Sequence, residues 1–133
     1  MNVIRREYYE TNGAIKRVIP YVNGKKNGTE LAYSEKGIII HIKNWRDDLP
    51  HGLEVEYPEF NSRRYRVNYR DGVKHGFRVT HHQNGRTKNT RSYNNGKKNG
   101  LEVETDENAK PKYEFRWKDG IRIFQRRKSL TNK

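Results

Sequence analysis

Two copies of the hexapeptide NGKKNG, at residues 23–28 and 95–100, are the first candidates for chemistry in this sequence. Glycines four apart around a lysine pair could form a loop that holds a phosphate group. The glycine-rich loop of nucleotide-binding proteins has a longer spacing and opens a helix, whereas neither copy precedes a helix-like segment. We therefore favour the alternative interpretation, in which the hexapeptide is a turn of a repeated fold.

Paired carboxylates are the second candidate for chemistry. Glu54 and Glu56 could serve as an acid–base pair. We expect instead that they lie on the solvent face of a strand, where Arg64 and Arg66 of the neighbouring strand form ion pairs with them. No Ser–His–acid or Cys–His set can be assembled from the remaining residues, so we predict a protein that is not an enzyme and needs no cofactor.

Histidines are the third candidate, as ligands for a metal ion. His81 and His82 are adjacent, so they point to opposite faces of a strand and are poorly placed to bind one ion. His51 and His75 each precede a glycine, in positions where other parts of the chain have asparagine. A repeat in the sequence explains their positions, and we predict no metal site.

A period of 24 residues runs through the chain without an insertion. The two hexapeptides lie 72 residues apart, and intermediate copies occur between them. The clearest series are aromatic residues and glycines, namely Tyr21, Trp45, Tyr69, Tyr93 and Trp117, and Gly28, Gly52, Gly76 and Gly100. Such a period indicates that one small structural unit is stacked several times.

Each unit is predicted to be two strands joined by tight turns. Residues 53–57 alternate between apolar side chains and glutamate, and residues 64–69 alternate between arginine or asparagine and apolar side chains, which is typical of half-buried strands. Four of the five turns that follow contain Asn-Gly or Asp-Gly, the pairs that tolerate the positive φ angles of a type I′ hairpin. In the remaining copy Asp48 replaces the glycine, and we expect a remodelled turn there.

The predicted fold is all-β, a single-layer, elongated antiparallel meander of repeated β-hairpins. Residues 1–125 form one domain, with units at about 9–20 (partial), 21–44, 45–68, 69–92, 93–116 and 117–125 (partial), and residues 126–133 form a basic tail. Roughly nine strands at about 4.8 Å spacing would give a ribbon about 40 Å long. Both ends of such a ribbon are open edges.

The segments YVNGKKNGTELAY, YRDGVKHGFRVTH and YNNGKKNGLEVET resemble the MORN repeat, in particular its bacterial and viral variant form. WRDDLPHGLEVEY carries the same pattern with Asp48 at the first glycine. The resemblance covers about residues 9–120 and implies a scaffold or binding module without catalysis. It also implies partners such as other proteins or anionic phospholipids, and an antitoxin or immunity role for some members.

Composition and charge limit the class of partner. The chain has 133 residues, no cysteine, and 29 Lys and Arg against 16 Asp and Glu, a formal net charge of +13. The absence of cysteine excludes disulfides, and no signal peptide is recognisable, so we expect a cytoplasmic or otherwise intracellular protein. A strongly basic chain attracts polyanions, which include nucleic acid, anionic membranes and acidic proteins.

The basic residues are predicted to gather on one long edge and in the tail. The residues assigned to polyanion binding there are Lys25, Lys26, Arg70, Lys74, Lys97, Lys98, Lys118, Arg122, Arg126, Arg127 and Lys128. We interpret the lysines of both NGKKNG copies as free choices on an exposed edge. The alternative is that the charge only keeps the ribbon soluble.

The aromatic side of the strands is the second predicted contact surface. Its assigned residues are Tyr65, Tyr69, Arg91, Tyr93, Tyr113, Phe115 and Trp117. Polar residues such as Lys43 and Arg91 interrupt the aromatic residues, which suits an interface. They would equally suit a part of the sheet that is open to water.

These observations favour a non-enzymatic repeat scaffold that binds an acidic protein surface or nucleic acid through its basic edge and aromatic face. Peripheral binding to an anionic phospholipid membrane is the first alternative. A toxin-binding immunity or antitoxin protein is the second. Self-association through the open edges or the aromatic face is also consistent with the sequence.

Overall fold

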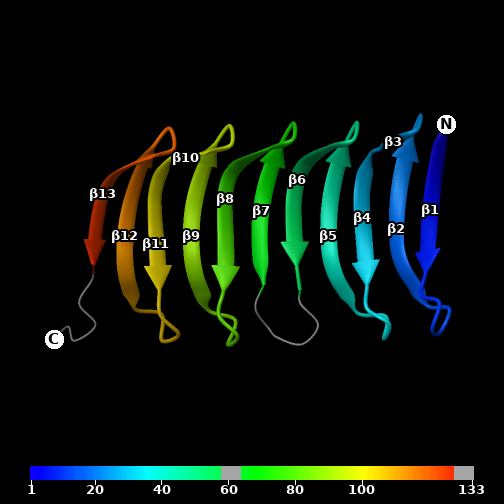
Figure 1. Cartoon of the computed structure of the whole chain (residues 1–133), viewed down its shortest axis with the longest axis horizontal. Helices are drawn as coiled ribbons and strands as arrows, with labels where there is room; N and C mark the ends of the chain where they lie inside the picture. The colour runs from blue at the N-terminus through cyan, green and yellow to red at the C-terminus, as the bar shows by residue number, and fades with distance from the viewer. Residues whose placement is uncertain (58–63, 128–133) are drawn as a thin grey trace.

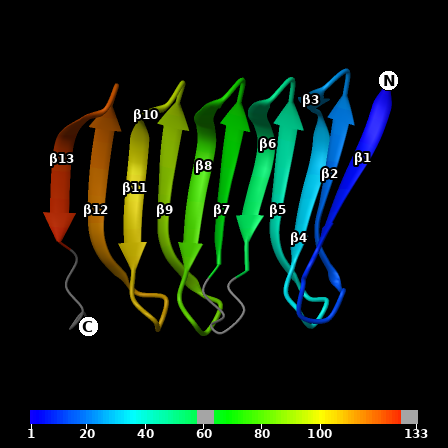
Figure 2. The ribbon, with the colours of Figure 1, turned by 45° about the vertical axis from the view of Figure 1, so that its right-hand side comes forward.

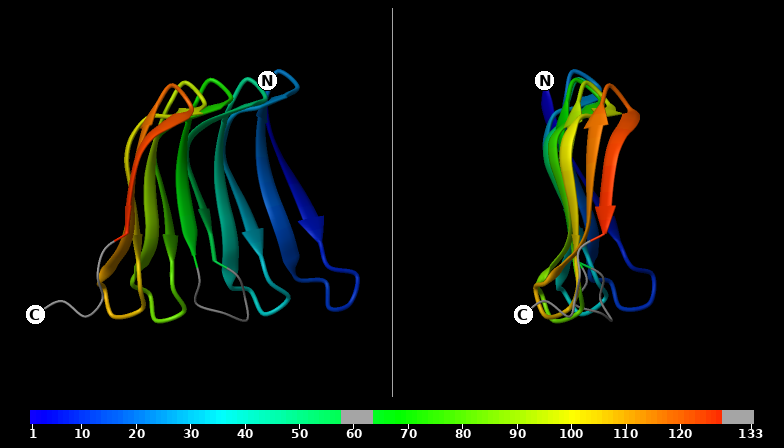
Figure 3. Two further views of the ribbon diagram at one scale, coloured as in Figure 1. Left: turned by 60° about the vertical axis from the view of Figure 1, so that its left-hand side comes forward. Right: turned by 90° about the vertical axis from the view of Figure 1, so that its left-hand side faces the viewer.

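A computed structural model describes residues 1–57 and 64–127, and all regular structure in these ranges is β-strand. The strands form one sheet that follows the chain order from one end to the other (Figures 1 and 2). Seen from its end, the sheet is one thin curved layer (Figure 3). The predicted fold, a single-layer antiparallel meander of hairpins, is confirmed.

The described ranges contain thirteen strands, more than the nine expected. Eleven follow one another across the sheet, and the two-residue strands β3 and β10 pair with β2 and β9. The strands are β1 (Asn2–Tyr8), β2 (Ile15–Val22), β3 (Lys25–Lys26), β4 (Gly28–Tyr33), β5 (Ile39–Arg46), β6 (Leu49–Glu56), β7 (Tyr65–Arg70), β8 (Val73–His81), β9 (Thr87–Asn94), β10 (Lys97–Lys98), β11 (Gly100–Thr105), β12 (Pro111–Lys118) and β13 (Ile121–Arg127).

Strand β13 reaches Arg127, so Arg126 and Arg127 belong to the sheet. The sequence placed both of them in a tail. Pairing with β12 extends the strand, because Glu114 lies opposite Arg126 and Tyr113 opposite Arg127. Lys128 and the rest of the predicted tail lie outside the described residues.

Tight turns join the strands along one long side of the ribbon. Asn23 and Gly24 have φ angles of 50° and 81°, as a type I′ turn requires. The expectation of a remodelled turn at Asp48 is wrong, because Asp47 and Asp48 have φ angles of 47° and 68°. The Asp48 carboxylate accepts a 2.7 Å hydrogen bond from the backbone N–H of Lys26, which ties this turn to the preceding one.

The histidines before the repeat glycines also link successive turns. His51 Nδ1 accepts a hydrogen bond from the Asp71 backbone N–H at 3.1 Å, and His75 Nδ1 accepts one from Asn95 at 3.4 Å. Asn99 Oδ1 accepts the equivalent bond in the next copy. The repeat therefore uses these histidines as acceptors between turns.

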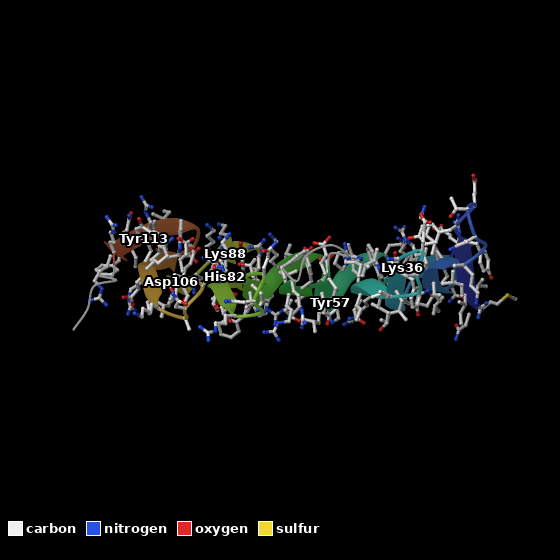
Figure 4. The ribbon with its side chains drawn as sticks, turned by 90° about the horizontal axis from the view of Figure 1, so that it is seen from below. Lys36, Tyr57, His82, Lys88, Asp106 and Tyr113 are labelled. Atoms are coloured by element: carbon white, nitrogen blue, oxygen red, sulfur yellow. The ribbon has the colours of Figure 1, made fainter. Side chains whose placement is uncertain are left out.

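The two faces of the sheet differ in character. We call the face that carries Tyr21, Trp45, Tyr69, Tyr93 and Trp117 the aromatic face. The other, the aliphatic face, carries Leu31, Ile42, Val55, Val79 and Val103. Figure 4 shows Tyr113 and Tyr57 on opposite sides of the ribbon, the first on the aromatic face and the second on the aliphatic face.

The predicted solvent position is wrong for Glu54, which is 5% exposed, whereas Glu56 is exposed as predicted. Glu54 lies opposite Val67, and Glu56 lies opposite Tyr65, so both glutamates are on the aromatic face. Arg66 lies opposite Val55 on the other face, and within residues 1–57 and 64–127 neither glutamate forms the expected ion pair with Arg64 or Arg66. Side chains alternate within each strand as predicted, but the register between β6 and β7 decides which residues of the two strands share a face.

Candidate anion-binding face

Buried carboxylates form the centre of the aromatic face. Glu30, Glu54 and Glu102 occupy one position of the repeat and are 5%, 5% and 4% exposed. The indole Nε1 of Trp45 donates to Glu30 at 2.9 Å, and that of Trp117 donates to Glu102 at 2.8 Å. A buried charge is costly unless it is paired and hydrogen-bonded, so these carboxylates require the partners around them.

The second carboxylate has an imidazole and two phenols as neighbours. His41 Nε2 lies 2.6 Å from the Glu54 carboxylate. Burial raises the pKa of Tyr65 to about 12, and the negative charges of Glu54 and Glu56 act in the same direction. Burial and the charge of Glu54 also raise the pKa of Tyr69. Both phenols therefore stay protonated and can donate hydrogen bonds at neutral pH.

The third carboxylate explains two polar residues that interrupt the aromatic side. Glu102 accepts a 2.9 Å hydrogen bond from Asn89 Nδ2 and forms an ion pair with Arg91 at 3.2 Å. Arg91 Nε also donates to Asn89 Oδ1 at 3.1 Å. These side chains complete a hydrogen-bonded network, so Arg91 is held in a fixed place.

Cationic side chains cover the aromatic rings of this face. We call Lys26, Lys43, Lys74, Arg78, Lys98 and Arg122 the ring-bound cations. The charged groups of Lys26 and Lys43 lie 4.4 Å and 4.7 Å from the centre of the Trp45 ring, and that of Lys98 lies 4.2 Å from Trp117. Lys74 lies 5.2 Å from the Tyr93 ring centre, Arg78 lies 5.5 Å from Tyr65, and Arg122 lies 5.9 Å from Phe115. The face therefore presents rows of positive charge supported by rings, an arrangement in which cation and ring attract each other.

The lysine pairs of NGKKNG have two different structural roles. Lys25 and Lys97 are exposed at the turns. Lys26 and Lys98 are half-buried over the two tryptophans, and Lys26 also forms a 3.5 Å ion pair with Glu30. The interpretation of all four lysines as free edge residues is wrong, because the alternation along β3 and β10 turns every second lysine onto the aromatic face.

The remaining residues assigned to the basic edge lie in several places. Arg70 and Lys118 are exposed where β7 and β12 end. Arg126 forms an ion pair with Glu114, and Arg127 is exposed on β13 opposite Tyr113. The edge predicted from the sequence is thus divided between the turns and both faces of the sheet.

All seven residues of the predicted aromatic contact surface lie on the aromatic face. They are Tyr65 and Tyr69 on β7, Arg91 and Tyr93 on β9, and Tyr113, Phe115 and Trp117 on β12. Tyr93 is buried, and the rings of Tyr113 and Phe115 stack with centres 5.9 Å apart. Since cations cover most of these rings, the charges and not the ring faces are what a partner would first meet.

A hollow of about 420 Å³ opens in the middle strands. Its charged lining residues are Arg64, Arg78, Lys88, Arg91, Glu56 and Glu104. Tyr65, Thr80 and Asn89 add hydroxyl and amide groups. The Arg64 guanidinium lies over the Tyr57 ring on the aliphatic face, so three cations, Arg78, Lys88 and Arg91, stand against the two carboxylates of the lining.

Three of these cations, Arg64, Arg78 and Lys88, were not assigned to a binding site from the sequence. Arg78 occupies the repeat position that holds glutamate in the other three described copies. Lys88 is the extra residue of a bulge in β9, since Thr80 pairs with Asn89 and His81 pairs with Thr87. The glutamate-to-arginine change within a regular series was the signal that could have located Arg78, whereas a bulge re-aims a side chain in a way that only pairing reveals.

Among residues 1–57 and 64–127, no three His, Cys, Asp or Glu side chains come together as a metal site would require. The same ranges contain no helix that could cross a membrane. No protein-family model matches this chain, and no curated protein matches its sequence. The resemblance to the MORN repeat stays a prediction from the sequence.

Proposed function

We propose that this chain is a non-enzymatic repeat scaffold that binds an acidic macromolecule along its aromatic face. The observation that carries the proposal is the set of ring-bound cations, which the repeat places on one face of a ribbon with a formal net charge of +13. Long-range attraction by such a charge raises the association rate with an acidic partner. Rings beneath the cations hold them at defined positions.

A nucleic-acid strand fits this arrangement better than an acidic protein surface does. Lys26, Lys74, Lys98 and Arg122 occupy one position of the repeat, which Pro50 interrupts in the second unit. Equivalent cations therefore lie at multiples of about 10 Å along the ribbon. Phosphates also recur regularly along a nucleic acid, whereas carboxylates on a folded protein do not.

Binding of a fluorescent single-stranded oligonucleotide at about 50 mM and about 200 mM salt tests the proposal. We expect affinity to fall steeply with salt, because each neutralised phosphate releases counterions. An acidic polypeptide of similar length and vesicles with anionic lipid serve as the competing partners. Absence of oligonucleotide binding at low salt, or tighter binding to either competitor, would contradict the nucleic-acid assignment.

Matched double variants distinguish the aromatic face from the turn edge. Lys43→Gln with Lys74→Gln removes two charges from the face, and Lys25→Gln with Lys97→Gln removes two from the exposed turns. We expect the first pair to weaken binding more than the second. The reverse order would show that the partner contacts the turn edge.

A further inference from the structure

The hollow lies where the repeat changes its chemistry. Glu30, Glu54 and Glu102 place a buried carboxylate on the aromatic face, but the copy between the last two has Arg78. Arg78 lies directly opposite Arg91 in the pairing of β8 with β9. Like charges directly opposite each other destabilise an antiparallel pair, so this position is unfavourable for the ribbon alone.

The two arginines differ in what neutralises them. Arg91 forms an ion pair with Glu102 and a hydrogen bond to Asn89. Arg78 lies over the Tyr65 ring, and within the described part of the chain no carboxylate oxygen lies within 4.0 Å of its guanidinium. Its N–H donors are therefore directed at no acid among residues 1–57 and 64–127, which is the arrangement expected of a group that binds an external anion.

The bulge at Lys88 adds a further cation to the same hollow. Arg64 lines the margin of the hollow, but its guanidinium lies over the Tyr57 ring on the aliphatic face. Thr80 supplies a hydroxyl and Tyr65 a protonated phenol. A volume of about 420 Å³ is within the range of small-molecule sites. Charge, donors and size together describe a site for a doubly charged oxyanion attached to a group no larger than a nucleoside.

We propose that this hollow binds a phosphate monoester, the terminal phosphate of a nucleotide or of a nucleic-acid strand lying on the aromatic face. Guanidinium groups bind phosphate oxygens through paired hydrogen bonds, and a monoester carries about −1.5 to −2 charges at pH 7, which Arg78, Lys88 and Arg91 of the lining can neutralise. This inference rests on the proposed function. Ring-bound cations on both sides of the hollow favour a strand over a phosphopeptide, whose other charges are sparse.

The test compares two oligonucleotides of one sequence that differ only in a 5′-phosphate or a 5′-hydroxyl. We expect the phosphorylated strand to bind about tenfold more tightly, as charge-assisted hydrogen bonds to one group would give. Equal affinity of the two strands would overturn the inference and leave the proposed function standing. Failure of both strands to bind would contradict the proposed function instead.

Variants at one position separate binding from folding. Arg78→Glu restores the residue of the other copies and places an acid opposite Arg91, so it should raise the thermal unfolding temperature while it abolishes the preference for the 5′-phosphate. Arg70→Gln, an exposed control that loses one charge, should keep the preference. A preference that survives Arg78→Glu would overturn the assignment of the hollow.

A nucleoside monophosphate and a phosphoserine peptide complete the experiment. The nucleotide should displace the phosphorylated strand from the wild-type protein. It should not displace the strand from the Arg78→Glu variant. Stronger competition by the phosphopeptide than by the nucleotide would show that the phosphate comes from a protein, which would overturn the assignment to nucleic acid.

Discussion

At one turn position of the repeat, an alanine stands where other copies of the unit have glycine. In the turns opposite the NGKKNG side, Gly37 and Gly85 have φ angles of 82° and 87°, and Ala109 takes the same place with a φ of 65°. All three turns close with the same hydrogen bond, from this residue to the carbonyl three residues earlier. Ala109 therefore accepts a left-handed conformation that the turn imposes on it.

Ala109→Gly is expected to raise the free energy of unfolding by about 1 kcal/mol, because a left-handed conformation costs an L-residue about that much. The matched change Gly37→Ala should lower it by a similar amount. A Cβ at Gly37 would have no atom within 4 Å, so only the backbone conformation is altered. Urea unfolding of both variants measures the effect, and equal signs for the two changes would contradict this account.

Tyr65 should make the stability of the fold depend on pH in alkaline solution. Burial raises its pKa from 10.0 to about 12, assisted by the charges of Glu54 and Glu56. The neutral phenol is favoured in the folded state, so its contribution to stability is complete below pH 10 and is lost as the pH rises through 12. We expect Tyr65→Phe to lose less stability than the wild type between pH 10 and pH 12.

The same variant permits a direct titration. The tyrosinate absorbance of the wild type minus that of Tyr65→Phe should show a midpoint well above 10. A midpoint at or below 10 would contradict the burial of this hydroxyl among carboxylates.

At the scale of elements, the short strands β3 and β10 turn a repeated dipeptide into two unlike positions. Lys26 and Lys98 cover tryptophan rings, whereas Lys25 and Lys97 point outward at the turn. Hairpins with fixed turns make this difference recur in each unit. A lysine pair in the sequence is thus one structural and one exposed residue.

Replacing both Lys26 and Lys98 with Ser should lower the free energy of unfolding by about 1–3 kcal/mol, because two cation–π contacts and an ion pair to Glu30 are lost. The same replacement of Lys25 and Lys97 should change it by less than about 0.5 kcal/mol, as exposed substitutions usually do. Thermal and urea unfolding of the two double variants measure the difference. Equal losses from the two pairs would contradict the separate roles.

The described part of the molecule is an open ribbon in which each long strand pairs only with the strands beside it. The buried apolar side chains among the described residues are Ile19 in β2, Val55 in β6, Val67 in β7 and Tyr93 in β9, while every residue of β13 is exposed. Stability of such an array is a sum of local contributions. Its ends therefore open more easily than its middle.

Hydrogen exchange measures this gradient. Amides of β6 to β9 should exchange more slowly than those of β1 and β13, since the terminal strands have a neighbour on one side only. Unusual protection of β1 or β13 that rises with protein concentration would instead show that copies associate through their open edges.

The sequence by itself determined the repeat, and through it the architecture. The 24-residue period, the alternation within strands and the Asn-Gly and Asp-Gly turns predict a meander, because each is a local property of the chain. It also predicted that Arg91, Tyr65 and Trp117 share one face, since each lies in a strand with the same alternation. The expected ribbon was too short, because the strands at both ends have no complete unit around them.

Only the tertiary structure decided what surrounds each charge. The register between β6 and β7 turned Glu54 inward, because pairing and not sequence spacing sets which residues lie opposite each other. Pairing likewise placed Arg78 against Arg91, and a bulge aimed Lys88 at the same hollow. The distribution of charge in the sequence predicted a basic edge. In the structure, packing places several of these cations over aromatic rings and leaves Arg78 without an acid among the described residues.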